Sequence, residues 1–469
     1  MSEQQDIEAV DAIVARARAA QARYAATANQ DQLRLTVQAV AWALMEPARN
    51  QALSEHAVAS TGLGNVADKV RKNHRKTLGL MRDVLAAATT GVVREDPASG
   101  ITEIARPVGV VGAVVPSTNP VATPTNNVIN ALACGNAIVL SPSPRGAAVC
   151  EQLIAYIHAE FAKIGADPDL VQMVPAPSSK VKTQHLMESV DLLIVTGSQD
   201  NVRRAYASGT PAIGVGAGNV SVIVDGSGDL DAAAEKIAAS KSFDNATSCS
   251  SENALIVLDA VYDDMLAALH RAGGRLLQGA DAAALHGALF QAQGLNKHLI
   301  ARDIDVLIAG VGVSVPDADT ARFLLIEGDG VGASHPESGE KLSLVTTLYR
   351  VPDFDAAKRL ATALFTHVGA GHSIGLHSAD EPRALELARE LPTCRVIVNQ
   401  AHCFATGGSF DNGMPFSLSM GCGSWGGNSI DDNLHYKHFM NISKVVRVIP
   451  PREPSLDAVF EHYWAHAGR

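Results

Sequence analysis

The segment that decides the fold runs from Pro107 to Gly146 and reads PVGVVGAVVPSTNPVATPTNNVINALACGNAIVLSPSPRG. Val110 to Val115 is a short apolar run of strand length, Thr123 to Ala133 is long enough for a helix, and Ala137 to Leu140 is a second apolar run. Short runs without polar alternation are typical of strands that are buried on both faces. A strand, a helix and a strand in this order predict a parallel sheet covered by helices.

The alternation of strands and helices continues beyond this segment. It extends to about residue 220, and a second alternating block runs from about Ser221 to Gln400. The chain before Thr90 reads as helices, because apolar residues recur at helical spacing over Ile7 to Tyr24 and over Asp31 to Met45. We therefore expect two α/β domains with a cleft between them, which is a common place for a ligand.

A small β element is expected outside these two domains. Val92 to Glu95 and Ile101 to Ile104 flank the turn residues Asp96 to Gly100, which is the pattern of a hairpin. Near the end of the chain, Lys444 to Ile449 reads as a final apolar strand.

Composition and charge exclude several classes of function. The 469 residues are 47% hydrophobic, which is enough for about two or three domains with their own cores. Lys and Arg number 38 against 49 Asp and Glu, so the net charge of −11 offers no general attraction to nucleic acid or an anionic membrane. The basic run Lys69 to Lys76 is expected to form a solvated helix face, with a phosphate site as the alternative.

No segment of the chain reads as a signal peptide or a membrane span. Met1 to Asp6 is polar and acidic, and Val108 to Val115, among the longest apolar stretches, is too short to cross a bilayer. We expect a cytoplasmic protein. The cysteines contain no CxxC pair, which argues against a disulfide framework and against a zinc site. They stand at positions 134, 150, 249, 394, 403 and 422.

Cys249 is the strongest candidate for a nucleophile. It lies in FDNATSCSSEN, residues 243–253, just before the apolar strand Ala254 to Leu258. Small polar neighbours are poor material for a core, and a turn of such residues before a strand can present a thiol with free backbone N–H groups. Taken alone, the segment leaves a structural cysteine as the alternative.

Several loops at the ends of predicted strands could bind a ligand. Asn119 follows the strand Val110 to Val115, so its amide could stabilise an oxyanion, although an Asn-Pro turn would explain it equally. Ser198 precedes a helix, where it could cap the helix or help bind a phosphate. Gly214 to Asn219 is not a GxGxxG fingerprint and is a weak signal alone. The four glycines within Gly421 to Asn428 indicate either close approach to a ligand or a tight turn.

Taken in order, these segments resemble the aldehyde dehydrogenase superfamily, and specifically its CoA-acylating branch, over about residues 5–447. The most specific marks are FDN and SE around Cys249, PVGVVG at 107–112 leading into TNP at 118–120, and GCGSWGGNS at 421–429. The residues around Cys249 look most like those of acylating sulfoacetaldehyde dehydrogenases.

The resemblance implies a role for each matching residue. Cys249 would attack the aldehyde carbon and later carry a thioester, and Asn119 with the Cys249 N–H would form the oxyanion hole. Ser198 would face the cofactor pyrophosphate, and Glu340 would hold the nicotinamide ribose. Arg145 is the candidate cation for an NADP phosphate, so NADP is favoured slightly over NAD. The residues expected at the cofactor are Ser117, Thr118, Ser141, Arg145, Gly197, Ser198, Gly216 and Glu340.

A departure from the hydrolytic members points to CoA as the acyl acceptor. Those members carry Glu-Leu-Gly-Gly, whose Glu activates water, whereas this chain has GVGA at 214–217 with glycine at the Glu position. A thiol such as that of CoA attacks thioesters more readily than unactivated water does. His372 resembles a histidine of the acylating branch that assists the CoA thiol, with a loop histidine bonded to backbone as the alternative.

The substrate implied by the resemblance is sulfoacetaldehyde. The hydroxyls of Thr247, Ser248, Ser250 and Ser251 would suit a polar or anionic group near the carbonyl, or could bond to the backbone. Succinate semialdehyde, acetaldehyde and propionaldehyde remain alternative substrates. A hydrolytic aldehyde dehydrogenase, a catalytically silent nucleotide-binding protein and an acyl-phosphate reductase are the competing functions.

The resemblance also implies three structural parts. Residues 1–91 and 106–220, with a return of the chain near 410–437, would form a Rossmann-like domain that binds the dinucleotide and CoA. Residues 221–409 would form the α/β catalytic domain that carries Cys249. Residues 92–105 and 438–455 would form a small β element for oligomerisation, which implies a homodimer or a homotetramer.

Overall fold

The segment 107–146 folds as predicted in the computed structural model, which describes residues 2–469. Its three elements are β3 (Val110–Val115), α5 (Ala122–Ala133) and β4 (Ala137–Pro142). The residues of β3, β4 and α5 are buried throughout, as expected for the centre of a layered α/β unit.

The first sheet has five parallel strands in the order β5-β4-β3-β6-β7. Its other strands are β5 (Val171–Met173), β6 (Leu192–Thr196) and β7 (Ala212–Val215). The chain moves outward from β3 through β4 to β5 and then returns to the other side of β3 as β6. The crevice at the carboxyl ends of β3 and β6 is therefore a topological switch point, where open α/β sheets bind ligands.

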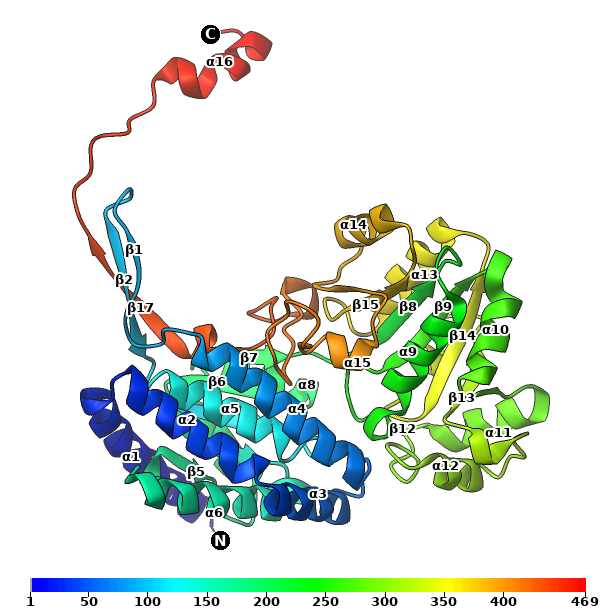
Figure 1. Ribbon diagram of the computed structural model, residues 1–469, viewed down its shortest axis with the longest axis horizontal. Helices are drawn as coiled ribbons and strands as arrows, with labels where there is room; N and C mark the ends of the chain where they lie inside the picture. The colour runs from blue at the N-terminus through cyan, green and yellow to red at the C-terminus, as the bar shows by residue number, and fades with distance from the viewer. Residues whose placement is uncertain (1) are drawn as a thin grey trace.

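Helices from the N-terminal part of the chain cover this sheet (Figure 1). The predicted helices at Ile7 to Tyr24 and at Asp31 to Met45 are confirmed. The helices of this unit are α1 (Glu3–Thr27), α2 (Gln30–Met45), α3 (Pro47–Thr61), α4 (Val66–Leu85), α6 (Ala147–Ile164), α7 (Lys180–Ser189) and α8 (Gln199–Ala207). One apolar core joins these helices to the sheet and also includes Phe416, Leu434 and Phe439 from late in the chain.

The second sheet has seven parallel strands in the order β10-β13-β14-β9-β8-β15-β16. They are β8 (Val220–Val224), β9 (Glu252–Leu258), β10 (Gly274–Leu276), β13 (Phe323–Glu327), β14 (Val345–Val351), β15 (Ile374–His377) and β16 (Val396–Val398). A short antiparallel pair, β11 (Phe290–Gln291) and β12 (Gly294–Leu295), lies outside this sheet.

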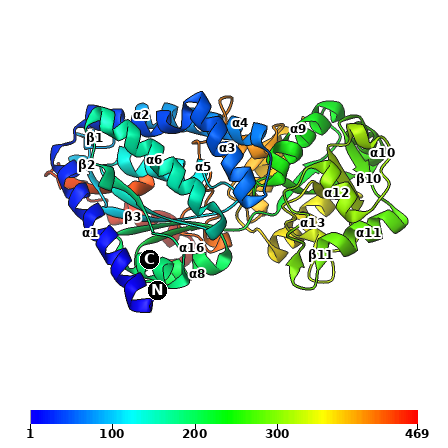
Figure 2. The same cartoon turned by 90° about the horizontal axis from the view of Figure 1, so that it is seen from below.

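Two apolar cores pack against the second sheet. One includes residues of α9 (Leu230–Ser242), α10 (Tyr262–Arg271), α11 (Gly279–Leu289) and α12 (Ile304–Val311). The other includes residues of α13 (Phe354–His367) and α14 (Glu381–Glu390), and the short helix α15 (His402–Ala405) follows β16. The two α/β units lie side by side (Figure 2), which agrees with the expected α/β architecture. The residue limits given above for the domains stay a prediction.

A three-stranded antiparallel sheet, in the order β1-β2-β17, projects from the first unit (Figure 1). The predicted hairpin is confirmed by β1 (Gly91–Asp96) and β2 (Ile101–Pro107). The final strand, β17 (Met440–Val446), begins and ends earlier than the expected Lys444 to Ile449. Beyond it, the unpredicted helix α16 (Leu456–Ala467) stands away from the body of the molecule.

Among residues 2–469, no helix has both the length and the apolar character that crossing a membrane requires.

Candidate active site

A cavity of about 380 Å³ brings together loops that follow β3, β6 and β7, the loop that carries Cys249, and one face of α4. Cys249, Asn119, Thr118, Gly216 and Glu340 all line it. A second cavity of about 500 Å³ adjoins the first, because Pro116, Thr196, Gly197 and Ser198 line both. The shared residues follow β3 and β6, so the two cavities meet at the topological switch point.

The backbone before Cys249 is held in an unusual conformation. Asp244, Asn245 and Ala246 have φ values of 48°, 52° and 59°, in the left-handed region that non-glycine residues rarely adopt. Such residues cost about 1–3 kcal/mol each and persist only where the surroundings hold them. The N–H of Asp244 donates to Asp68 at 2.8 Å, and the amide of Asn245 donates to Asp303 at 2.7 Å.

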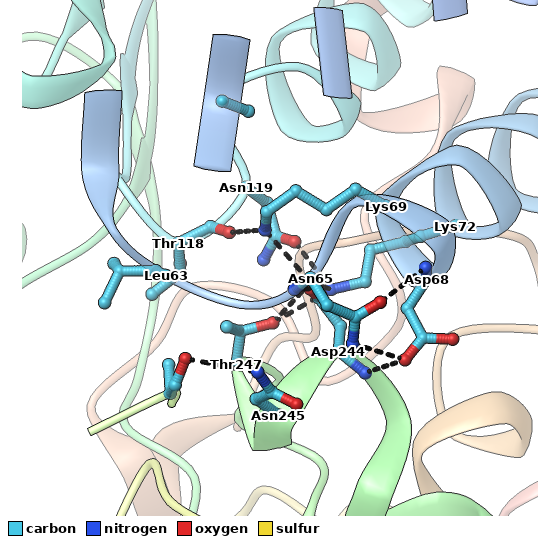
Figure 3. A network of polar contacts seen from close by, with 12 residues as sticks. Leu63, Asn65, Asp68, Lys69, Lys72, Thr118, Asn119, Asp244, Asn245 and Thr247 are labelled. Atoms are coloured by element: carbon cyan, nitrogen blue, oxygen red, sulfur yellow. Dashed lines mark hydrogen bonds and ion pairs between the residues drawn. The ribbon is translucent and has the colours of Figure 1, made fainter. Parts of the chain in front are cut away.

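Two lysines of α4 complete this network around the Asp244 carboxylate (Figure 3). Lys69 and Lys72 both form ion pairs with Asp244, and Thr247 donates a hydrogen bond to it at 2.7 Å. Burial alone would raise the pKa of Asp244, but the charges of Lys72 and Lys69 outweigh that effect and lower it. The loop before Cys249 is therefore fixed against the first α/β unit by buried charges.

The expectation of a solvated helix face for Lys69 to Lys76 is wrong. Lys69, Lys72 and Lys76 are 4%, 5% and 8% exposed and face the cavity region rather than solvent. They lie on the same face of α4 as the buried Leu80 and Val84, because residues three or four apart share one side of a helix. Their charge serves the site, whereas the exposed side of α4 carries residues such as Arg71 and His74.

The side chain of Asn119 is held in a defined orientation. Its Oδ1 accepts a hydrogen bond from Lys72 at 2.9 Å. Since a lysine ammonium only donates, this contact assigns the amide oxygen and leaves Nδ2 free to donate elsewhere. Within residues 2–469, no acceptor of another residue binds the N–H of Cys249. Two preorganised donors beside the nucleophile are what a developing oxyanion requires.

His372 is brought into contact with the nucleophile from behind the cavity. Its Nε2 lies 3.3 Å from Cys249 Sγ, and its Nδ1 lies 2.8 Å from Ser373 Oγ, which in turn is 2.8 Å from Nε2 of His402. The carbonyl of His372 accepts from Arg395 at 3.0 Å. These bonds fix the imidazole, so the contact with Cys249 is built into the fold.

The resting pair is a neutral thiol beside a neutral imidazole. Burial raises the pKa of Cys249 to about 12, and the nearby Glu340 carboxylate adds to this shift. Burial and the charge of Arg395 lower the pKa of His372 to about 3. The imidazole is therefore unprotonated and can accept a hydrogen bond from the thiol. Because its pKa is low, it can hold the thiol proton only when negative charge forms beside it, as on the carbonyl oxygen during attack on the aldehyde.

The position that carries the water-activating Glu in hydrolytic enzymes cannot hold one here. A Cβ on Gly214 would lie 2.5 Å from Cγ1 of Val202, and the side chain would point toward α8. Glu340 is the one carboxylate among the described residues that line the catalytic cavity. Burial raises its pKa to about 8, so it is largely protonated at neutral pH.

The second cavity has the polar lining that a phosphate-bearing cofactor needs. Ser117, Ser141, Gly197 and Ser198 line it, and Ser198 caps α8 by accepting from the N–H of Asn201 at 3.3 Å. Exposed N–H groups and the dipole of this nine-residue helix favour an anion at its start. The space beside Gly197 is open, so the chain fits a dinucleotide there.

The structure does not bring Arg145 to either cavity. Its side chain is exposed in the turn after β4, and the cations that line the second cavity are Lys180 and Arg204. Both lie on helices that the sequence did not mark as basic sites, α7 and α8. Arg204 donates to Oε1 of Gln184 at 3.1 Å, which holds its guanidinium in place.

The glycine-rich segment Gly421 to Asn428 supports the site rather than lining it. The side-chain oxygen of Asn428 accepts from the N–H groups of Gly216 and Cys422 at 3.1 and 2.9 Å. A Cβ on Gly371 would lie 1.8 Å from the carbonyl oxygen of Cys422, so only glycine permits this packing. The segment therefore positions Gly216 and the His372 loop.

Most hydroxyls around Cys249 already have partners. Thr247 binds Asp244 and Lys72, and the hydroxyls of Ser248 and Ser250 bind each other at 2.7 Å. Ser251 does not line the cavity, and its hydroxyl is buried without a partner among the described residues.

Sequence reasoning missed the residues that orient the site, namely Lys72, Ser373 and Arg395.

Comparison with known proteins identifies the family of the chain. A sequence profile of the aldehyde dehydrogenase family matches residues 2–301. A curated relative from Cupriavidus necator, sulfoacetaldehyde dehydrogenase (acylating), is 54% identical over 98% of this chain and 94% of its own.

Two solved structures resemble the whole chain. An acetylating aldehyde dehydrogenase from Geobacillus thermoglucosidasius has a TM-score of 0.91 at 31% identity, covering 97% of this chain and 99% of its own. A propionaldehyde dehydrogenase from Rhodopseudomonas palustris, with bound CoA and an acylated cysteine, has a TM-score of 0.83 at 27% identity, covering 93% and 97%. This chain belongs to the aldehyde dehydrogenase family, among its acylating members.

Proposed function

We propose that this protein converts sulfoacetaldehyde, CoA and NAD(P)+ to sulfoacetyl-CoA, NAD(P)H and a proton. The observation that carries the chemistry is the placement of Cys249 Sγ 3.3 Å from His372 Nε2 beside the oriented amide of Asn119. The 54% identical relative from Cupriavidus necator supports the choice of aldehyde.

The first half-reaction uses groups that the structure has already aligned. His372 accepts the thiol proton as the Cys249 sulfur adds to the aldehyde carbon, and the carbonyl oxygen becomes an oxyanion. The Asn119 amide and the Cys249 N–H stabilise that oxyanion. When bound, the nicotinamide cofactor supplies an acceptor for the hydride that leaves the carbon, and a thioester remains on Cys249.

In the second half-reaction, the thiol of CoA attacks the thioester. Before this step His372 releases the first proton to solvent. It then accepts the CoA proton and returns it to the departing Cys249 sulfur, and the oxyanion hole acts again. Water competes poorly because glycine occupies position 214 and Glu340 is largely protonated at neutral pH. The product is therefore a thioester of CoA rather than a free acid.

NADP is the cofactor that the lining of the second cavity favours. A 2′-phosphate needs a cation near the ribose, and Lys180 and Arg204 supply two. Replacing Arg204 with Gln should lower kcat/KM for NADP more than for NAD. Equal losses for the two cofactors would instead assign Arg204 a structural role.

A homo-oligomer in the cytoplasm is the proposed physiological form. The strand β17 and the segment after it expose Val446 and Val448 at 70% and 101%, and α16 exposes Leu456 and Tyr463 at 63% and 62%. Apolar side chains gathered on a projecting element favour contact with another copy of the chain.

Steady-state assays with and without CoA test the proposed reaction. Sulfoacetaldehyde, succinate semialdehyde and propionaldehyde are compared at equal concentrations, with NADPH formation as the readout. The expected result is turnover that requires CoA and has its highest kcat/KM with sulfoacetaldehyde. A higher kcat/KM for either competitor would overturn the substrate assignment.

A further inference from the structure

Two cations of α4 face the catalytic cavity without forming an ion pair in the part of the chain that the structure describes. Both Lys76 and Arg75 line it. The Nζ of Lys76 donates only to the carbonyl oxygens of Gly407 and Ser417, the latter at 3.0 Å. Arg75 donates to Ser409 Oγ at 2.8 Å and to the carbonyl oxygens of Gly408 and Phe404 at 3.4 Å. The Asp411 carboxylate accepts from the same Ser409 hydroxyl and interacts with the charge of Arg75 without forming an ion pair. Neither forms an ion pair anywhere in residues 2–469, whereas Lys69 and Lys72 share Asp244.

This arrangement leaves uncompensated positive charge in a buried place. Lys76 is only 8% exposed, and burying a charge without a counterion is costly unless a ligand supplies one. Burial, followed by the charge of Arg75, lowers the pKa of Lys76 to about 7. An anion that enters the cavity beside Lys76 reduces the free-energy cost of burying its positive charge.

Lys76 and Arg75, together called the cationic wall, line the same cavity as Cys249. The aromatic rings of Phe404 and Phe416 lie against the cations, with ring centroids 5.3 Å from the Arg75 guanidinium and 5.7 Å from the Lys76 ammonium. These rings exclude water and strengthen any charge interaction there.

The hydroxyls around Cys249 would bind an anion more weakly than the cationic wall does, because they are uncharged. The Thr247 hydroxyl donates to Asp244, and the bond between Ser248 and Ser250 uses one of their two hydroxyl protons, which leaves one neutral donor for a ligand. Lys72 is also occupied, because it binds Asn119, Asp244 and Thr247. Among the described residues, Lys76 and Arg75 are therefore the cations of this cavity that form no ion pair, and Lys76 has the least compensated charge.

We propose that Lys76 and Arg75 bind the sulfonate group of the substrate and make the enzyme selective for an anionic aldehyde. This assignment rests on the proposed substrate and identifies which residues recognise it. The sulfonate lies two bonds from the carbonyl carbon, so a cationic wall beside the nucleophile suits it. The neutral propionaldehyde offers these cations no counterion.

Substitution of the two cations tests the assignment. Lys76→Met and Arg75→Gln should raise KM for sulfoacetaldehyde by about 10- to 100-fold, because each removes a charge-assisted hydrogen bond to a buried anion. KM for propionaldehyde should stay unchanged or fall. Lys297→Met is the matched control, since Lys297 is exposed and remote from the cavity. Lys76→Arg should retain most of the selectivity.

The outcomes separate this assignment from the proposed function. If the wild-type enzyme uses sulfoacetaldehyde with CoA but both variants keep its KM, the assignment is overturned and the function stands. If KM rises equally for both aldehydes, the cations shape the cavity and the assignment is likewise overturned. Failure of the wild-type enzyme to use sulfoacetaldehyde overturns both.

A measurement on the wild-type enzyme covers the case in which the variants do not fold. Ethanesulfonate should inhibit competitively with sulfoacetaldehyde, and its inhibition constant should rise above about pH 7 as Lys76 loses its proton. The neutral ethyl methyl sulfone should show no such rise. The charged and titratable groups near Lys76 are Arg75, Lys72, Cys403 and Cys249, and Glu340 also lines the cavity. A pH-independent constant for ethanesulfonate would overturn the assignment.

Discussion

At the scale of single residues, the proposed oxyanion hole depends on the orientation of the Asn119 amide. Asn119→Ala should lower kcat by about 100- to 1,000-fold with little change in KM, because the lost hydrogen bond forms mainly in the transition state. Lys72→Met should lower kcat as well, since Lys72 holds the amide oxygen. Unchanged kcat in Asn119→Ala would remove Asn119 from the oxyanion hole.

The Cys249–His372 pair makes a prediction about pH. Since burial raises the thiol pKa to about 12, the thiolate fraction should grow throughout the neutral range. The rate of Cys249 alkylation by iodoacetamide in the free enzyme should therefore rise about tenfold per pH unit from pH 6 to 9. A plateau in this range would show a preformed thiolate–imidazolium pair. Mass spectrometry identifies the modified cysteine, and Cys249→Ala is the control.

Sequence reasoning identified some site residues better than others. Cys249 and Asn119 follow short-range signals, namely small polar neighbours and a position at the end of a buried strand. Lys76 was missed because a run of basic residues usually marks a solvated helix face. Its spacing to Leu80 and Val84 was the available signal, since all three share one side of α4.

At the scale of elements, the contact of α4 with the Cys249 loop joins the two α/β units through buried ion pairs. Asp244→Asn leaves Lys69 and Lys72 without their counterion, and breaking a buried ion pair in this way costs about 3–5 kcal/mol. We expect a lower temperature of thermal inactivation together with a lower kcat. Asp264→Asn, an exposed change on α10, is the control. Wild-type thermal behaviour in Asp244→Asn would contradict this account of the loop.

The ion pairs of Asp244 with Lys69 and Lys72 also predict that the enzyme loses stability in acid. The pKa of Asp244 is lower in the folded state than in the unfolded chain. The ionised carboxylate therefore stabilises the fold at pH values above its unfolded-state pKa, and this stabilisation is lost as the pH falls through the folded-state pKa. The temperature of thermal inactivation should fall in acid more steeply for the wild-type enzyme than for Asp244→Asn.

Buried strands were the elements that the sequence predicted best. The bounds of β3 were correct because a continuous apolar run between turn residues has few other structures. Helices α7 and α16 were missed for a different reason. The helix α7 is mostly polar, and α16 has little contact with the rest of the chain, so neither shows a strong pattern of burial within one subunit.

At the scale of the whole molecule, the projecting sheet and α16 predict the assembly. Removing residues 450–469 should lower the mass measured by light scattering during size-exclusion chromatography, because exposed apolar side chains on α16 are lost. A double change on β17, Val445→Glu with Val446→Glu, should have the same effect. A monomer in the full-length protein would contradict the proposed homo-oligomer.

Transfer of the acyl group from Cys249 to CoA rather than to water is tested most directly by a single-turnover experiment without CoA. The enzyme is mixed with sulfoacetaldehyde and NADP, NADPH is followed by absorbance, and Cys249 is examined by mass spectrometry. We predict one equivalent of NADPH per active site, a sulfoacetyl group on Cys249, and renewed turnover when CoA is added. Continued NADPH formation without CoA, or an unmodified Cys249 after the burst, would contradict the mechanism.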